Sequence, residues 1–90
     1  MELTVNKNNW TGETIKVKIN KKEKRFTLYG YEFKIEKKDH GIFHLIGSDW
    51  KSKLVTIFET DGWYQTYGGP VHLESKNLFE TAIQYLCNVL

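Results

Sequence analysis

Apolar and polar residues alternate along most of the first 73 positions, which is the pattern of half-buried β-strands. The alternation is clearest at Ile15, Val17 and Ile19, where Lys16 and Lys18 take the opposite parity. One face of such a strand packs on a core and the other meets water. The pattern therefore predicts a sheet with one covered face over this part of the chain.

The phase of the alternation changes at Gly30. Either a β-bulge or a two-residue turn explains the change, because glycine tolerates the positive φ that both require. The turn would pair Leu28 with Tyr31 and Phe26 with Phe33.

Further turns and strands follow in the same manner. The Asp-Gly pair at 61–62, between β-rich runs, is typical of a hairpin. The segments 42–46 and 53–60 are apolar on both parities, as expected for strands covered on both faces. The pattern predicts turns at 20–24, 37–41, 47–52 and 61–62, and strands at 42–46, 53–60, 63–67 and, as a short edge piece, 71–73.

The C-terminal segment predicts a helix. Asn77 with Glu80 three residues later resembles a capping box, and Glu80 suits the positive end of the helix dipole. Apolar residues cover an arc of about 200°, whereas a surface helix needs little more than about 100°. Either the sheet curls round this helix, or another chain covers the remaining apolar surface.

These elements predict an α+β fold: an antiparallel β-meander of about five to six strands, strongly bent and packed on one C-terminal helix. No repeat or linker divides the 90 residues, so we expect a single domain over 1–90, with strands within 2–73 and a helix at about 77–90. No apolar run reaches the roughly 18 residues of a membrane span, and the N-terminus lacks a signal-peptide core. We expect a cytoplasmic protein.

Charge is distributed unevenly. Residues 1–53 hold twelve basic and seven acidic side chains, whereas residues 54–90 hold one basic and four acidic. Such polarity favours a macromolecular partner. Twelve lysines stand against one arginine, a bias that AT-rich coding sequence produces and that indicates a low-GC bacterium or one of its phages or plasmids.

Catalytic and metal-binding patterns are weak. The three histidines are His40, His44 and His72, and the first two would lie about 13 Å apart on a strand. Cys87 is the one cysteine, it lies in an apolar helical run, and no serine sits on a strand-to-helix elbow. We expect no enzyme activity, no cofactor and no metal.

Two surface features remain as candidate sites. Tryptophan and tyrosine anchor protein interfaces, and the candidates are Trp50, Trp63, Tyr64 and Tyr67, with Trp10 near the first turn. The alternative is nucleic-acid binding by a basic hairpin that neutralises phosphates and stacks bases on neighbouring aromatics. Its residues are Lys16, Lys18, Lys21, Lys22, Lys24 and Arg25.

The tail HLESKNLFETAIQYLCNVL, after a strand, resembles the end of pleckstrin-homology domains. That resemblance implies a bent sheet capped by one helix, and phosphoinositide binding by Lys18, Lys22, Lys24 and Arg25. It covers about a quarter of the chain, and no tryptophan follows Trp63, whereas the helix of that family carries one.

In size and composition the chain also resembles small phage proteins of low-GC bacteria, some of which block host defence. We therefore expect a non-enzymatic protein that binds a protein partner stoichiometrically, in an accessory or inhibitory role. A homodimer through the helix or the central strands is a further possibility.

Overall fold

Eight strands and one helix make up the part of the chain that the structure, a computed structural model, describes, namely residues 1–8 and 11–90. Each strand pairs antiparallel with the next, so the order in the sheet is the order in the chain. The predicted α+β meander on one C-terminal helix is confirmed, with eight strands rather than five to six. The elements are β1 (Glu2–Asn6), β2 (Thr14–Asn20), β3 (Arg25–Leu28), β4 (Tyr31–Asp39), β5 (Ile42–Ile46), β6 (Lys53–Thr60), β7 (Trp63–Tyr67), β8 (Glu74–Ser75) and α1 (Leu78–Val89).

The change of phase at Gly30 is a two-residue turn. Leu28 pairs with Tyr31 and Phe26 with Phe33, as the turn predicts. The two turn residues both have positive φ, which two-residue hairpins of this kind require. The turn brings the rings of Phe26 and Phe33 to a centroid distance of 5.7 Å on the inner face.

The Asp61-Gly62 hairpin is confirmed, because Thr60 pairs with Trp63 across it. The turn predicted at 37–41 is shorter in the structure. Strand β4 continues to Asp39 through a register shift after Lys37, and only residues 40–41 turn. The bulge absorbs the polar residues that suggested a longer turn.

The last strand lies at Glu74–Ser75 rather than at 71–73. The Thr66 hydroxyl explains the difference. It accepts a hydrogen bond from the backbone N–H of Leu73 at 2.8 Å in place of a backbone carbonyl, so that of the two backbone bonds of a regular pair only the one from the Thr66 N–H to the Leu73 carbonyl is formed, at 2.9 Å. Regular pairing resumes only at Glu74, which faces Gln65.

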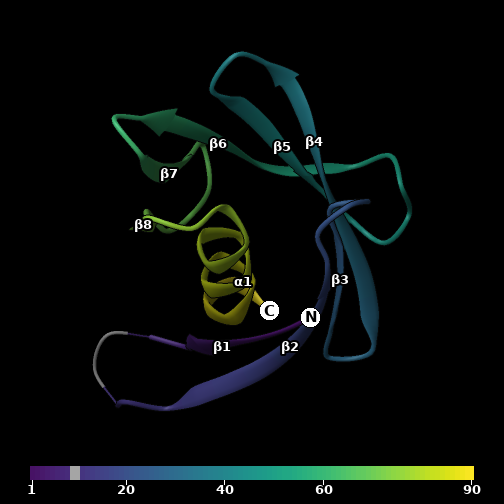
Figure 1. Ribbon diagram of the computed structural model, residues 1–90, viewed down its shortest axis with the longest axis vertical. Coiled ribbons are helices and arrows are strands. Elements are labelled where there is room, and N and C mark those ends of the chain that lie inside the picture. Colours follow the sequence, from purple (N-terminus) through teal and green to yellow (C-terminus); the bar gives the residue numbers. More distant parts are fainter. Residues whose placement is uncertain (9–10) are drawn as a thin grey trace.

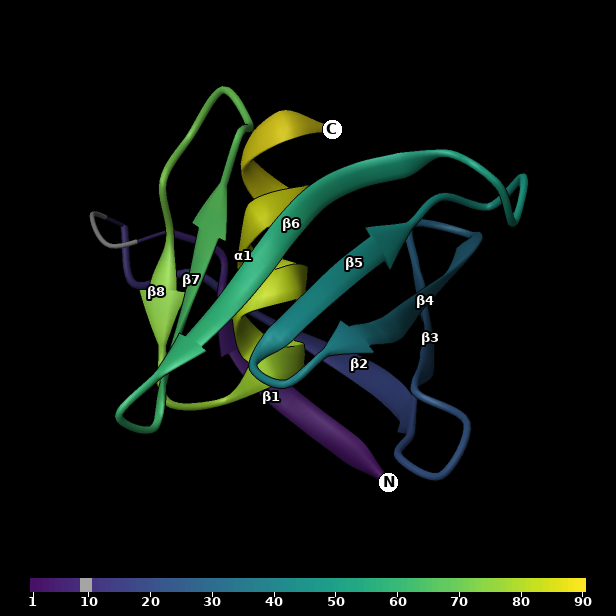
Figure 2. The same cartoon turned by 90° about the horizontal axis from the view of Figure 1, so that it is seen from above.

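The sheet curls round the helix, as Figures 1 and 2 show. Helix α1 begins where the Asn77 side chain accepts a hydrogen bond from the backbone N–H of Glu80 at 3.0 Å. Seven of its residues are buried: Phe79, Thr81, Ala82, Ile83, Gln84, Tyr85 and Leu86. The large apolar arc is therefore used mainly within the chain.

Two polar residues of α1 tie it to the strands at both edges of the sheet. The Thr81 hydroxyl lies 2.7 Å from the hydroxyl of Ser75 in β8. Near the other edge, the Asn88 amide donates to the backbone carbonyl of Lys7, just beyond β1, at 2.9 Å. The polar stripe of the helix thus bridges strands that do not pair with each other.

The middle strands β5 and β6 have one buried face. Phe43, Leu45, Val55 and Ile57 point into the core. On the other parity Ile42, His44, Thr56 and Phe58 are only half-buried. The prediction that these strands are covered on both faces is therefore wrong for Ile42, His44, Thr56 and Phe58. Ile46 is the exception on that parity: it is buried at the end of β5, where the register shifts.

Candidate functional site

The four aromatic residues predicted from the sequence lie in three different places. Trp63 and Tyr67 lie on the outer face of β7, and Tyr64 has the opposite parity and packs on Phe43, with ring centroids 6.0 Å apart. Trp50 lies in the 47–52 loop, at the other end of β6 from the Asp61-Gly62 turn (Figure 1). Trp10 lies outside the described residues. The structure therefore brings together only Trp63 and Tyr67.

Phe58 completes the group on the outer face. It pairs with Gln65, so Trp63 and Tyr67 flank it diagonally on the neighbouring strand. The rings of Phe58 and Tyr67 meet edge to face, with centroids 5.6 Å apart. Trp63 is 41% exposed and Tyr67 is 69% exposed. We call Phe58, Trp63 and Tyr67 the outer aromatic patch.

An acidic residue shares the outer face with the outer aromatic patch. Glu74 faces Gln65 across the β7–β8 pairing, and Asp61 is exposed in the adjoining turn, whereas Glu59 pairs with the inward Tyr64 and has the opposite parity. A cation is also close: the Nζ atom of Lys76 lies 5.2 Å from the centroid of the Trp63 ring. An apolar centre with the Glu74 carboxylate at its border suits a partner with a cation at the matching position.

His44 lies on β5, the strand next to the one that carries Phe58, on the same outer face and opposite Thr56, which itself faces Tyr67. Partial burial lowers the pKa of His44, and the nearby Lys53 and Lys38 lower it further, while Glu36 acts in the opposite direction. The neutral imidazole is therefore favoured beside the patch.

The predicted basic hairpin consists of β2, β3 and their turn. These strands lie near the β1 end of the sheet, whereas the outer aromatic patch lies near the β8 end. Lys16 and Lys18 project from the outer face of β2, because Val17 and Ile19 are buried. Arg25 projects outward from β3, beside the buried Phe26. The turn lysines Lys21, Lys22 and Lys24 complete the set at 21–24.

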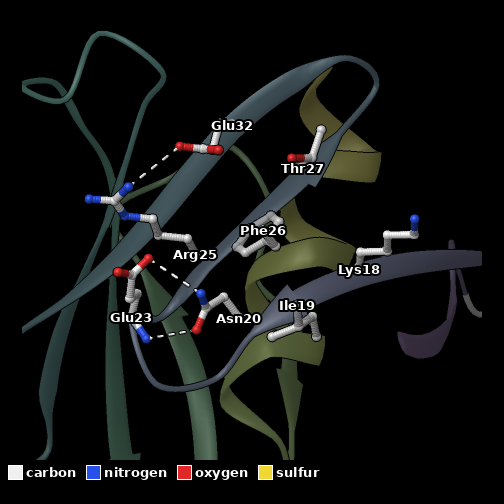
Figure 3. A pocket seen from close by; sticks show the side chains of 8 residues that line it. All are labelled: Lys18, Ile19, Asn20, Glu23, Arg25, Phe26, Thr27 and Glu32. Atoms are coloured by element: carbon white, nitrogen blue, oxygen red, sulfur yellow. Dashed lines mark hydrogen bonds and ion pairs between the residues drawn. The ribbon is translucent and has the colours of Figure 1, made fainter. Parts of the chain in front are cut away.

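A hollow of about 280 Å³ separates Lys18 from Arg25 (Figure 3). It forms because β2 and β3 make only two residue pairs, Ile19–Phe26 and Asn20–Arg25, and then diverge. Thr27 lines it on the β3 side, and hydrogen bonds between Asn20 and Glu23 close the opposite end. The hollow offers hydroxyl, amide and cationic groups together with the carboxylates of Glu23 and Glu32, a mixture suited to a polar ligand.

Trp50 lies against this basic region, a contact that the sequence does not predict. Its ring centroid is 4.8 Å from the guanidinium carbon of Arg25 and 5.3 Å from the Nζ atom of Lys34. Arg25 and Lys34 face each other directly across β3 and β4. No local motif signals the contact, because it joins residues 25 positions apart.

Asp49 fixes the loop that carries Trp50. Its carboxylate accepts hydrogen bonds from the backbone N–H groups of Lys51 and Ser52, each at 2.9 Å, and from the Ser52 hydroxyl. The hydroxyl bond first, and then the two backbone bonds, lower the pKa of Asp49 to about 2. The carboxylate is therefore charged, and the loop held, at neutral pH.

A second hollow, of about 460 Å³, lies near the C-terminal end of α1. Tyr31, Phe33, Leu54 and Leu90 supply its apolar lining. Nearby, the Tyr29 hydroxyl donates to the Cys87 sulfur at 3.7 Å, a contact that raises the pKa of Tyr29. These residues form an apolar rim at one end of the fold.

The described residues, 1–8 and 11–90, include no group of three histidine, cysteine, aspartate or glutamate side chains placed to hold a metal ion. His72 has a structural contact instead: its Nδ1 atom lies 3.1 Å from the carbonyl oxygen of Thr66. This contact fixes the loop between β7 and β8.

No protein family, curated protein or solved structure matches the chain. The resemblance of the tail to pleckstrin-homology domains therefore has no further support. Among the described residues, no helix is long and apolar enough to cross a membrane.

Proposed function

We propose that this protein is a non-enzymatic binding protein that makes stoichiometric contact with a protein partner through the outer aromatic patch. One observation carries the proposal: Phe58, Trp63 and Tyr67 form a contiguous aromatic group on a sheet face that no described element covers. Aromatic rings are costly to expose to water and are over-represented among the residues that dominate binding energy.

The surroundings of the patch define the partner's chemistry. Glu74 shares the outer face with it, Asp61 lies in the adjoining turn, and residues 54–90 carry three more acidic than basic side chains. The matching surface is an apolar socket with lysine or arginine at its edge. Its cations would meet these carboxylates and raise the rate of association.

The patch also has the local order that an anchor needs. Phe58 supports Tyr67 edge to face, and the ammonium group of Lys76 lies over the Trp63 ring. Rings that are already held in place lose little conformational entropy when a partner binds. Trp63 and Tyr67 are therefore the residues we expect to carry most of the affinity.

Affinity capture from a lysate of a low-GC bacterium tests the proposal, with the wild type, Trp63→Ala and Trp50→Ala as baits. Trp50 is the matched control, because it is a similarly exposed tryptophan at the other end of β6. We expect a protein that the wild type and Trp50→Ala retain and that Trp63→Ala loses. Native mass spectrometry of the purified pair should give one copy of each chain.

Identical capture by all three baits would contradict the proposal. So would a captured protein that Trp50→Ala loses and Trp63→Ala keeps. A second series with Glu74→Lys should slow association if the partner's border is basic, and unchanged association rates would remove the charge argument.

The biological setting and assembly state are part of the same proposal. The accessory or inhibitory role in a phage or mobile element, and the cytoplasmic location, stay predictions from composition. A homodimer through the central strands would use the outer face of β5 and β6, whereas most of α1 is enclosed by its own sheet. The mass in solution distinguishes such a homodimer from a monomer whose outer face stays free for another protein.

A further inference from the structure

Trp50 is an exposed aromatic ring placed on two cations. It is 38% exposed, and it lies within 5.3 Å of both Arg25 and Lys34, measured to its ring centroid. Two like charges directly opposite each other on neighbouring strands repel, so this pair needs a compensating negative group or π-face. The Trp50 ring supplies part of that compensation.

The loop holds this ring in position. The backbone N–H of Trp50 donates to the carbonyl of Gly47 at 2.9 Å, and that of Gly47 donates to the carbonyl of Ser52 at 2.8 Å. Trp50 itself has a φ of 61°, a left-handed conformation that is uncommon for a bulky residue. Together with the three bonds to Asp49, these contacts pre-organise the ring for a ligand.

The surrounding strands carry a strong excess of positive charge. Residues 14–38 hold nine basic and three acidic side chains. Two of the three acids are already paired here: Glu32 lies 3.9 Å from Arg25, and Glu36 lies 3.3 Å from both Lys34 and Lys38. These pairs are partly exposed and therefore weak, so an incoming phosphate can replace a carboxylate.

We infer that this region binds single-stranded nucleic acid, with a base stacked on Trp50 and adjacent phosphates held by Arg25 and Lys34. Lys18, across the polar hollow from Arg25 (Figure 3), takes a further phosphate along the strand. A base must be unpaired to stack on a protein ring, so duplexes bind less well. Lysine forms few bidentate contacts with bases, so the binding shows little sequence preference.

Fluorescence anisotropy with labelled oligonucleotides of about 12 mixed-sequence nucleotides, a length within the usual site size, tests the inference. Single-stranded DNA, single-stranded RNA, a duplex and inorganic polyphosphate are compared at low salt. We expect both single strands to bind more tightly than the duplex and polyphosphate. The slope of log affinity against log salt should become shallower by about 0.7 in Arg25→Gln and in Lys18→Gln.

Trp50→Ala should weaken single-strand binding by roughly 5- to 100-fold, the range seen when a base-stacking ring is removed. Trp63→Ala, at the other end of β6, should leave it unchanged, and Trp50→Phe should restore part of it. Equal effects of the two alanine variants would overturn the inference. So would polyphosphate binding as tight as that of the oligonucleotides, or no retention of either single strand at low salt.

Discussion

Gly69→Ala is expected to destabilise the fold, because Gly69 lies against the buried ring of Tyr85. A Cβ atom at position 69 would lie 2.6 Å from Cε1 and 2.8 Å from Cζ of that ring, and would also meet its hydroxyl. Tyr85 is 3% exposed, so its ring cannot move aside without disturbing the packing of α1 against the sheet. Overpacking of this kind costs about 1–3 kcal/mol.

Urea and thermal unfolding measure the effect. For a domain of this size, that cost lowers the Tm by roughly 5 to 20 °C. The matched control is Gly47→Ala, where the new Cβ would meet Leu54 Cδ2 at 3.5 Å, an ordinary contact. Its unfolding free energy should stay within about 0.5 kcal/mol of the wild type.

One outcome of these unfolding measurements would contradict the prediction. Equal stability of the two alanine variants would mean that the 68–70 loop does not press on α1 as described. Adding Tyr85→Phe to Gly69→Ala should recover part of the loss, because the hydroxyl is one of the atoms that the new methyl group meets. Simple additivity of the two substitutions would refute the proposed contact.

Two further predictions concern the helix start and the Trp50 loop. Asn77→Ala removes the acceptor for the backbone N–H of Glu80 and should lower the unfolding free energy by about 1 kcal/mol. Asn77→Asp keeps a side-chain acceptor and should retain most of that stability. Equal unfolding free energies of the two variants would argue against the cap. Asp49 has a folded pKa of about 2, below its ordinary 3.8, so its stabilisation is present above about pH 4 and is lost as the pH falls towards 2. The stability difference between the wild type and Asp49→Asn should therefore shrink over that window, and a difference that stays constant from pH 5 to pH 2 would be inconsistent with this role.

The sequence predicts the local pairing well where short-range chemistry decides it. The Gly30 turn fixes the pairing of Phe26 with Phe33, and the Asp61-Gly62 turn fixes that of Thr60 with Trp63. The last strand is less predictable, since the Thr66 hydroxyl takes the place of a backbone acceptor opposite Leu73 and regular pairing begins only at Glu74–Ser75.

The candidate sites are less predictable, because they depend on which face of a strand is covered. Alternation shows that Trp63 and Tyr64 point in opposite directions, but only the curl of the sheet decides that Tyr64 is the inward one. The contact of Trp50 with Arg25 depends on a left-handed loop residue and on strands far apart in sequence. Neither leaves a local pattern.

The measurement that tests the proposed function most directly is the dissociation constant of the captured partner, determined by calorimetry for the wild type, Trp63→Ala and Trp50→Ala. We predict one-to-one binding that Trp63→Ala weakens by about 30-fold or more, as for an anchor residue. Trp50→Ala should change it by less than about threefold. A Trp63→Ala variant that binds like the wild type would contradict the assignment of the outer aromatic patch as the binding surface.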